Sequence, residues 1–240
     1  MFRFVARSFR SSAVRNPFRV PMLILAAAAL VLVPSTRAQL NVPPAATQVH
    51  DPSVLKPPAG ARVAIVEWED MECPDCARAN PLLREAAAKY NIPWVRHDFP
   101  LPFHAWSMQA AINARWFDTK SKKLGDDYRD SVFANQNSIT SLEILAQFTQ
   151  KYAQDHGLAF PFAPDPQGKL VEQVKADYAL GQRVGIEHTP TIWVVTSNSK
   201  GAPFVEVVDR SKLYQLIDQA LADTKASATP PPAPKHTASK

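Results

Sequence analysis

The order of hydrophobic and polar positions predicts strands and helices that alternate along the middle of the chain. An apolar run rich in β-branched residues over 62–68 predicts a buried strand, and residues 93–98 predict a second one. Between them, apolar residues at helical spacing predict a helix over 73–90, which Pro81 is expected to kink. This order predicts a parallel strand pair with a right-handed crossover.

The second half of the pattern predicts a block of helices, then a strand hairpin and a last helix. Four helical patterns cover residues 104–117, 126–136, 141–156 and 170–184. Short strands at 191–195 and 204–208 precede an amphipathic helix at 211–224. The predicted fold class is therefore α/β, with a helical insertion between a strand–helix–strand half and a strand–hairpin–helix half.

The N-terminal segment has the pattern of an export signal. Residues 1–38 contain six Arg and no acid. Within them, an apolar run at 20–33 is followed by small residues. That run is shorter than the roughly 20 residues of a spanning helix, so a cleaved signal is favoured over a retained membrane anchor. An Arg-rich start also marks mitochondrial transit peptides, but the compact apolar run favours export to the periplasm or another extracytoplasmic space.

Two Pro-rich stretches flank one domain predicted at 61–225. Residues 39–60 are predicted to be a linker and residues 226–240 a disordered tail. Beyond residue 38 the chain has 27 − 6 = 21 basic residues against 22 acidic ones, a net charge of −1. The formal charge of +5 thus belongs to the export segment. No nucleic-acid partner is expected.

The candidate chemistry lies in the stretch ECPDC, Glu72 to Cys76, which holds the two cysteines of the sequence. A disulfide here closes a very small loop and would stabilise the fold by about 2 kcal/mol, so it is poorly placed as a structural staple. Cys73 lies where the first strand gives way to a helix, whose N-terminus stabilises a thiolate. Cys76 lies one turn further on. A C-x-x-C beside a strand–helix–strand pattern indicates a redox pair.

A second motif lies far along the chain, in EHTPT, directly before the strand at 191–195. Pro190 stands at the strand start, and with Thr189 it could form a cis peptide bond in a tight turn. Such a turn would bring the Thr189 backbone beside the Cys73 sulfur. His188 flanks the turn, where a protonated imidazole would favour the thiolate; a surface histidine without a role is the alternative.

VEWEDMECPDC, Pro81, the helical insertion and GIEHTPTIWVV together resemble the thioredoxin superfamily, and most closely its DsbA-like branch, over residues 62–224. The resemblance implies a thioredoxin-like fold and a thiol–disulfide oxidoreductase without a cofactor. It implies that Cys73 attacks or presents the disulfide and that Cys76 resolves the mixed disulfide. Thr189 and Pro190, with His188 beside them, would dock the substrate chain.

Glu67 occupies the position of a buried carboxylate that, in this family, assists proton transfer. The residues themselves agree, because Glu67 shares a strand face with Val63 and Ile65. Burial there would raise its pKa and let it exchange a proton with Cys76. A strand-end Glu that faces solvent is the alternative.

Asp75 departs from the pattern of the oxidising members, which usually carry a basic or aromatic residue next to the second cysteine. Three further acids lie upstream, at Glu69, Asp70 and Glu72. Their charge is expected to raise the pKa of Cys73 and weaken the protein as an oxidant, although acids also suit a helix N-terminus. Pro74 and Asp75 are the predicted redox-tuning residues, and the direction of electron flow stays open.

The expected partners are cysteine-containing substrate proteins and a membrane redox partner, either a quinone-linked oxidase or an electron donor. The alternative function is binding or delivery of copper or another metal by the two thiols, with His188 as a further ligand. A closed zinc site wants four ligands, so copper(I) suits two thiolates better. A third reading is a non-catalytic chaperone on the same fold, which the intact cysteine pair disfavours.

Overall fold

The computed structural model describes residues 46–197 and 202–227. The predicted export signal at 1–38 and most of the predicted tail lie outside these residues. Within the described ranges, no helix is long and apolar enough to cross a membrane.

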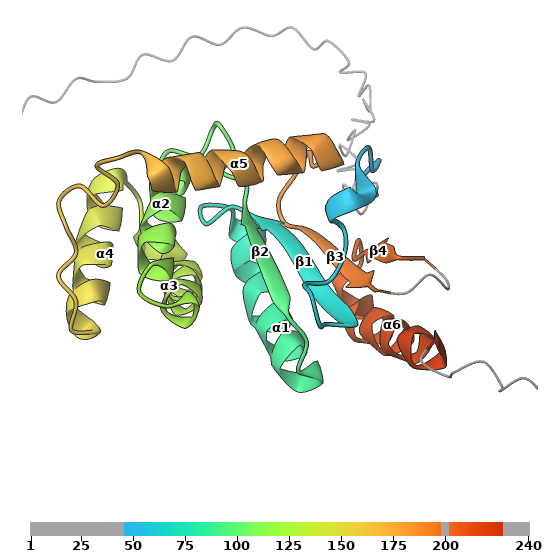
Figure 1. The fold of residues 1–240 in the computed structure, drawn as a ribbon. Coiled ribbons are helices and arrows are strands. Elements are labelled where there is room, and N and C mark those ends of the chain that lie inside the picture. Colours follow the sequence, from blue (N-terminus) through green and yellow to red (C-terminus); the bar gives the residue numbers. More distant parts are fainter. Residues whose placement is uncertain (1–45, 198–201, 228–240) are drawn as a thin grey trace, which may run out of the picture. The chain divides into compact units, whose positions relative to one another are not determined.

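A four-stranded sheet with the order β2–β1–β3–β4 organises the domain (Figure 1). β1 (Val63–Glu69) runs parallel to β2 (Trp94–Asp98) and antiparallel to β3 (Thr191–Thr196). β4 (Phe204–Glu206) completes an antiparallel hairpin with β3. Every residue of β1 and β3 is buried. The predicted parallel pair and hairpin are confirmed, although the last strand ends at Glu206 instead of residue 208.

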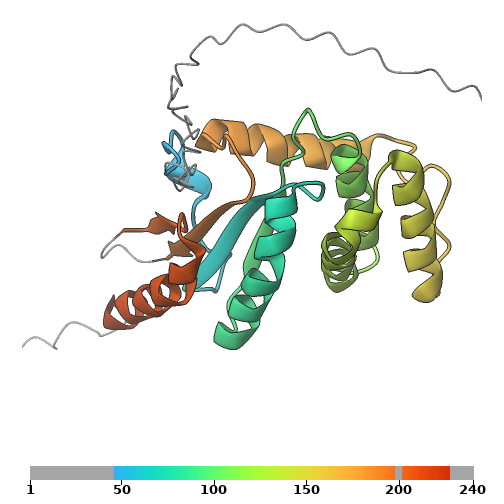
Figure 2. The ribbon, with the colours of Figure 1, turned by 180° about the vertical axis from the view of Figure 1, so that it is seen from behind.

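Helices cover both faces of the sheet. α1 (Pro74–Tyr90) and α6 (Leu213–Ser227) pack on the face that carries Val63 and Ile65, and Figure 2 shows both helices from that side. α5 (Lys169–Val184) packs on the other face, against the core that contains Val66 and Trp68. Because strand side chains alternate between faces, Glu67 points to the α1 side.

The predicted helical insertion connects β2 to β3. It consists of α2 (Ser107–Asp118), α3 (Lys122–Asn135), α4 (Leu142–Asp155) and α5. Trp106, Trp116 and Phe117 are buried in its core. That core also contains Cys73 and Cys76, so the insertion packs against the N-terminal end of α1.

Two serines set helix starts within the insertion. Ser121 and Ser141 cap α3 and α4 by accepting a hydrogen bond from the backbone N–H of the third residue of each helix. The cap at Ser121 places the start of α3 at Lys122, four residues before the predicted helix. α2 begins later than predicted, at Ser107 instead of residue 104. α1 continues through Pro81 as one helix.

Part of the stretch predicted as a linker packs on the domain. Leu55 is 2% exposed and belongs to the core beneath α5. The His50 N–H donates to the Val184 carbonyl at 2.9 Å, and the Thr47 hydroxyl donates to the Glu206 carboxylate at 2.9 Å. Residues 47–55 therefore pack on the domain, whose start was predicted at residue 61. The stretch contains the 3₁₀ helix η1 (Pro52–Val54), and the N–H of Leu55, which follows it, donates to the Pro52 carbonyl at 3.0 Å.

Candidate active site

Cys73 is the N-cap of α1, and Pro74 occupies the first helical position. Proline is favoured there because the missing N–H would have no helical partner. The Cys73 side chain is 8% exposed, whereas Cys76, one turn further along the helix, is fully buried. Both cysteines are reduced. The local sequence thus places the less deeply buried sulfur at the positive end of a helix dipole and a second sulfur behind it.

The turn before β3 closes over the first sulfur. The Thr189–Pro190 peptide bond is cis, and the Thr189 carbonyl oxygen lies 3.3 Å from the Cys73 sulfur. The prediction that this turn would lie beside Cys73 is confirmed, although 116 residues separate the two. The His188 carbonyl accepts from the Thr191 hydroxyl at 2.7 Å, which fixes the turn. The His188 side chain lines a small cleft of about 80 Å³ beside Pro190.

The two sulfurs have opposite proton affinities. The pKa of Cys73 is lowered to about 5, first by the hydrogen bond from the Cys76 thiol and then by Thr189 and the N–H groups of Cys76 and Asp75, against the opposing effect of burial. The pKa of Cys76 is raised well above its ordinary value, chiefly by burial. At neutral pH Cys73 is therefore a thiolate and Cys76 a thiol. The expectation that the nearby acids raise the pKa of Cys73 is wrong.

The partners of these acids explain the difference. Asp75 makes ion pairs with Arg78 at 3.0 Å and with Arg210 at 2.6 Å. Arg210 also donates to the Asp75 carbonyl at 3.1 Å. The two arginines thus balance the charge of Asp75. The N–H groups at the helix start can therefore lower the pKa of Cys73 without an opposing effect of the Asp75 charge.

The upstream acids are also engaged away from the sulfur. The Glu72 carboxylate accepts from the backbone N–H groups of Trp106 and Ser107 at 2.6 and 3.0 Å, which fixes the start of α2. The Asp70 carboxylate contacts the His104 ring at 2.7 Å. These contacts tie the loop between β2 and α2 to the loop that carries the cysteines.

Glu67 lies in the interior, with 1% of its surface exposed. Its predicted burial is confirmed, and the solvent-facing alternative is wrong. The Trp94 indole N–H donates to its carboxylate at 3.0 Å. Burial and the charge of Glu69 raise the pKa of Glu67 well above its ordinary value, against the opposing charge of Arg96. The Glu67 charge in turn contributes to the raised pKa of Cys76, so the two groups are electrostatically coupled.

Three contacts of the site escaped the sequence analysis. Besides Arg210 and Trp94, the buried Gln136 amide donates to the carbonyls of Met71 and Cys73 at 2.9 and 3.0 Å. Each of these residues lies 27 or more positions from its partner in the sequence. Of these contacts, the sequence indicated only the one with Trp94, through the predicted parallel pairing of β1 with β2, which puts Trp94 opposite Ile65 and close to Glu67.

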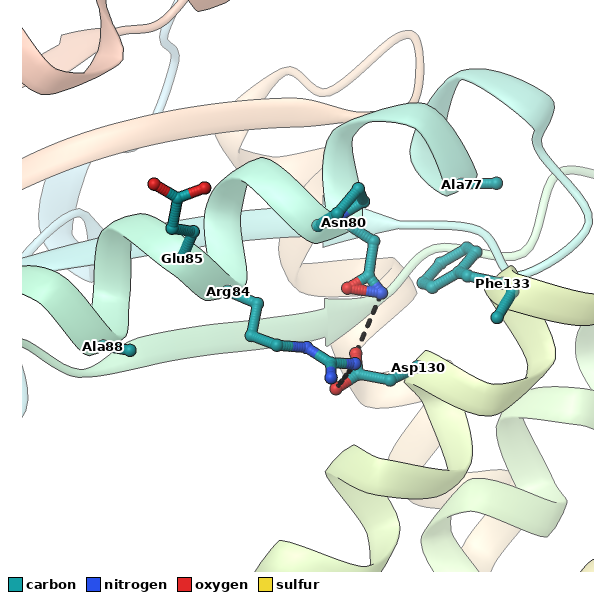
Figure 3. A pocket seen from close by; sticks show the side chains of 9 residues that line it. Ala77, Asn80, Arg84, Glu85, Ala88, Asp130 and Phe133 are labelled. Carbon is teal, nitrogen blue, oxygen red and sulfur yellow. Dashed lines mark hydrogen bonds and ion pairs between the residues drawn. The ribbon is translucent and has the colours of Figure 1, made fainter.

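A cavity of about 440 Å³ lies between α1 and α3 (Figure 3). Ala77, the residue after Cys76, is among the residues that line it, but neither cysteine is. Asn80 and Arg84 both contact Asp130 in it, and Figure 3 shows the two side chains converging on that carboxylate. Asp130 thus accepts from the Asn80 amide and pairs with Arg84, whereas the Asn80 Oδ1 atom has no hydrogen-bond partner among the described residues.

The predicted metal ligands do not form a cluster. Within the part of the chain that the structure describes, no three His, Cys, Asp or Glu side chains are arranged to hold a metal ion. His188 therefore does not join the two cysteines as a third ligand.

A cysteine pair at a helix start and a cis-proline turn, on a four-stranded sheet with a helical insertion, define a thioredoxin-like domain of the DsbA-like form. The sequence matches the family model described as thioredoxin over residues 58–210. The chain belongs to the thioredoxin family. The resemblance and the predicted fold class are thereby confirmed.

Solved structures share this fold at low sequence identity. Wolbachia pipientis α-DsbA1 is 14% identical with a TM-score of 0.57, covering 72% of this chain and 93% of that one. The thiol–disulfide exchange protein α-DsbA2 of the same organism is 16% identical with a TM-score of 0.52, covering 68% and 84%. A periplasmic thioredoxin-like protein from Salmonella enterica serovar Typhimurium is 18% identical with a TM-score of 0.53, covering 68% and 87%. No curated protein matches the sequence.

Proposed function

We propose that this protein is an exported thiol–disulfide oxidoreductase that acts on cysteines of extracytoplasmic proteins through Cys73 and Cys76. The observation that carries the proposal is the low pKa of Cys73, about 5, at a sulfur that lies beside the cis-proline turn. A thiolate of this kind is both a nucleophile and a good leaving group. The description of α-DsbA2 as a thiol–disulfide exchange protein supports the same chemistry.

The proposed reaction starts from the Cys73–Cys76 disulfide. A substrate thiolate attacks the Cys73 sulfur, and the bond to Cys76 breaks with both electrons going to Cys76. The buried Cys76 sulfur takes up a proton, which the protonated Glu67 carboxyl supplies. A second substrate thiolate then attacks the substrate sulfur of the mixed disulfide and expels Cys73 as a thiolate. The substrate loses two electrons and gains a disulfide, and the cysteine pair is reduced.

The proton affinities favour this direction. A stabilised Cys73 thiolate stabilises the reduced form, which makes the disulfide form a stronger oxidant. We therefore assign the protein the role of a disulfide donor. Thr189 and Pro190 would hold the substrate chain beside Cys73, with His188 at the edge of the cleft. A quinone-linked membrane oxidase would return the pair to the disulfide form.

The proposed location rests on the N-terminal segment together with the chemistry. Residues 1–38 have the pattern of an export signal, and disulfides persist in oxidising compartments. The periplasmic origin of the Salmonella neighbour supports the same location. We propose a periplasmic protein whose signal is cleaved; an uncleaved signal would leave it anchored.

The reduction potential of the cysteine pair tests the proposal. After equilibration with glutathione, we expect a reversible two-electron couple with a potential of about −120 to −180 mV, the range of disulfide donors. A potential near about −270 mV would instead make the protein a reductant. The absence of any couple would overturn the oxidoreductase function, and tight copper(I) binding by the same protein would then support metal delivery.

Replacing Glu67 with glutamine is expected to slow the exchange of the Cys76 proton. The amide neither donates nor accepts this proton as a carboxyl does, so mixed-disulfide resolution should become about ten- to a hundredfold slower at neutral pH. The rate is measured by stopped-flow release of a peptide from a preformed mixed disulfide at Cys73. Glu85→Gln, which changes an exposed carboxylate on α1, should leave the rate unchanged.

The pH dependence of stability gives Glu67→Gln a second readout. Because burial raises the pKa of Glu67 in the folded state, folding favours the protonated carboxyl. Its contribution to stability is complete below the unfolded pKa of about 4.3 and is lost as the pH rises through the folded pKa. The glutamine stays neutral, so its unfolding free energy relative to the wild type should grow with pH. A difference that stays constant would contradict the raised pKa.

A further inference from the structure

Arg210 reaches across the domain to the redox motif. It opens the 3₁₀ turn η3 (Arg210–Lys212), between β4 and α6. One guanidinium nitrogen lies 2.6 Å from the Asp75 carboxylate, and the other donates to the Asp75 carbonyl at 3.1 Å. Arg210 thus holds both the side chain and the backbone of a residue that lies 135 positions earlier in the sequence.

The held residue lies between the two cysteines. Asp75 directly precedes Cys76, and its backbone N–H is one of the groups that stabilise the Cys73 thiolate. Asp75 and Arg210 line the same small cleft as His188, Pro190 and Glu206. The Arg210 guanidinium is therefore a cation on the side of α1 where the cis-proline turn meets the cysteines.

Arg210 is better placed to balance the Asp75 charge than Arg78, the other arginine that pairs with this carboxylate. Arg78 pairs with the same carboxylate from the next turn of α1, but its side chain is 67% exposed, against 34% for Arg210. Solvent and salt screen an exposed pair more strongly. Arg78 also has no contact with the Asp75 backbone among those the structure describes. The two arginines thus form a natural comparison.

We propose that Arg210 is a redox-tuning residue that acts through Asp75: its guanidinium offsets the Asp75 charge and so stabilises the Cys73 thiolate of the reduced pair, which leaves the disulfide form higher in energy relative to the reduced form. The inference rests on the proposed function. The physical reason is an asymmetry of charge. The reduced form carries a thiolate that an uncompensated Asp75 would repel, whereas the disulfide form carries no charge there. A charge change at this position therefore alters the free energy of the reduced form and leaves that of the disulfide form nearly unchanged.

Arg210→Met tests the inference by removing the cation while keeping much of the side-chain volume. We expect the equilibrium constant for reduction of the pair by glutathione to fall about five- to tenfold; a tenfold fall corresponds to about 30 mV more negative. The thiolate absorbance of Cys73 should titrate at a higher pH. Arg78→Met should change the equilibrium constant by less than about twofold.

Asp75→Asn should shift the equilibrium in the opposite direction, because it removes the anion. The double variant, Asp75→Asn with Arg210→Met, should lie within about twofold of the wild type, since a balanced pair is replaced by neutral groups. Arg210→Lys keeps the charge without the forked geometry, and it should recover most of the wild-type value. Urea unfolding of each variant checks that the fold is intact.

The outcomes separate the inference from the proposed function. If the wild type shows a reversible couple that Arg210→Met leaves unchanged, the inference is overturned and the oxidoreductase function stands. If Arg210→Lys lowers the equilibrium constant as much as Arg210→Met does, Arg210 acts by its hydrogen bond to the backbone, and the electrostatic role is overturned. If Arg210→Met does not fold, the same decision rests on Arg210→Lys and Asp75→Asn. If the wild type shows no couple, the proposed function itself fails.

Discussion

Replacing Cys73 with serine is expected to abolish disulfide exchange, with a loss of at least about a thousandfold. A serine hydroxyl stays protonated at neutral pH and cannot form a disulfide, so both the nucleophile and the leaving group disappear. The helix start and the cis-proline turn remain in place, so the protein should still fold. The measurement is the rate of disulfide transfer to a reduced, unfolded substrate protein.

Replacing Cys76 with alanine is expected to remove the disulfide that the protein donates and to stop the reverse reaction, reduction of a substrate disulfide, half-way. Cys73 stays accessible to a substrate disulfide, but the sulfur that would resolve the mixed disulfide is missing. Mixed disulfides with substrate should therefore accumulate, visible as adducts in intact-protein mass spectrometry that a reductant removes. Because Cys76 is fully buried, no adduct is expected on Cys76 in the serine variant of Cys73. Adducts on Cys76 alone would reverse the roles assigned to the two cysteines.

Replacing Arg129 with methionine is expected to destabilise the fold by about 3–5 kcal/mol. Arg129 is 1% exposed, and its guanidinium donates to both carboxylate oxygens of Asp118 at 3.1 and 2.9 Å. It also lies 3.6 Å from Glu69 and 3.8 Å from Asp98, so it connects α3 to α2 and to the sheet. Removing it takes one cation from a buried charge cluster: Glu69 keeps Arg96 and Asp98 keeps Arg115, but Asp118 loses its bidentate partner. The excess negative charge left in the interior is costly.

Urea unfolding measures this loss directly. The matched control is Lys151→Met, which breaks an ion pair with Asp155 on the surface of α4, where the two side chains are 74% and 56% exposed. Exposed pairs contribute about 0–1 kcal/mol, so this control should unfold almost like the wild type. A loss below about 1 kcal/mol for Arg129→Met would mean that the buried carboxylates find other partners or become protonated.

The layout of the domain and the position of its cysteines could be predicted from local patterns along the chain. Strand and helix periods report which side chains are buried, so the alternation along β1 was enough to place Glu67 on the same face as Val63 and Ile65. The start of α1 at Cys73 and the turn before β3 follow from Pro74 and Pro190, whose effects on the backbone are local. Features that depend on neighbours in the chain could therefore be predicted.

Element ends and the packed part of the linker were less well determined. Whether the stretch around Leu55 packs depends on a complementary surface under α5, which no local pattern encodes. The early start of α3 depends on the Ser121 cap. A cap is the effect of one polar side chain, which the spacing of apolar residues does not reveal. In both cases one or two contacts moved the boundary.

The electrostatics of the site depend on contacts between residues that are far apart in the sequence. In the sequence, Asp75 is an acid next to the cysteines, and the expected effect was a raised pKa of Cys73. In the folded protein Arg210 meets Asp75 from 135 positions away, and the pKa of Cys73 is lowered to about 5. The effect of a charge depends on distances to all other charges in space, and spacing along the chain does not fix them.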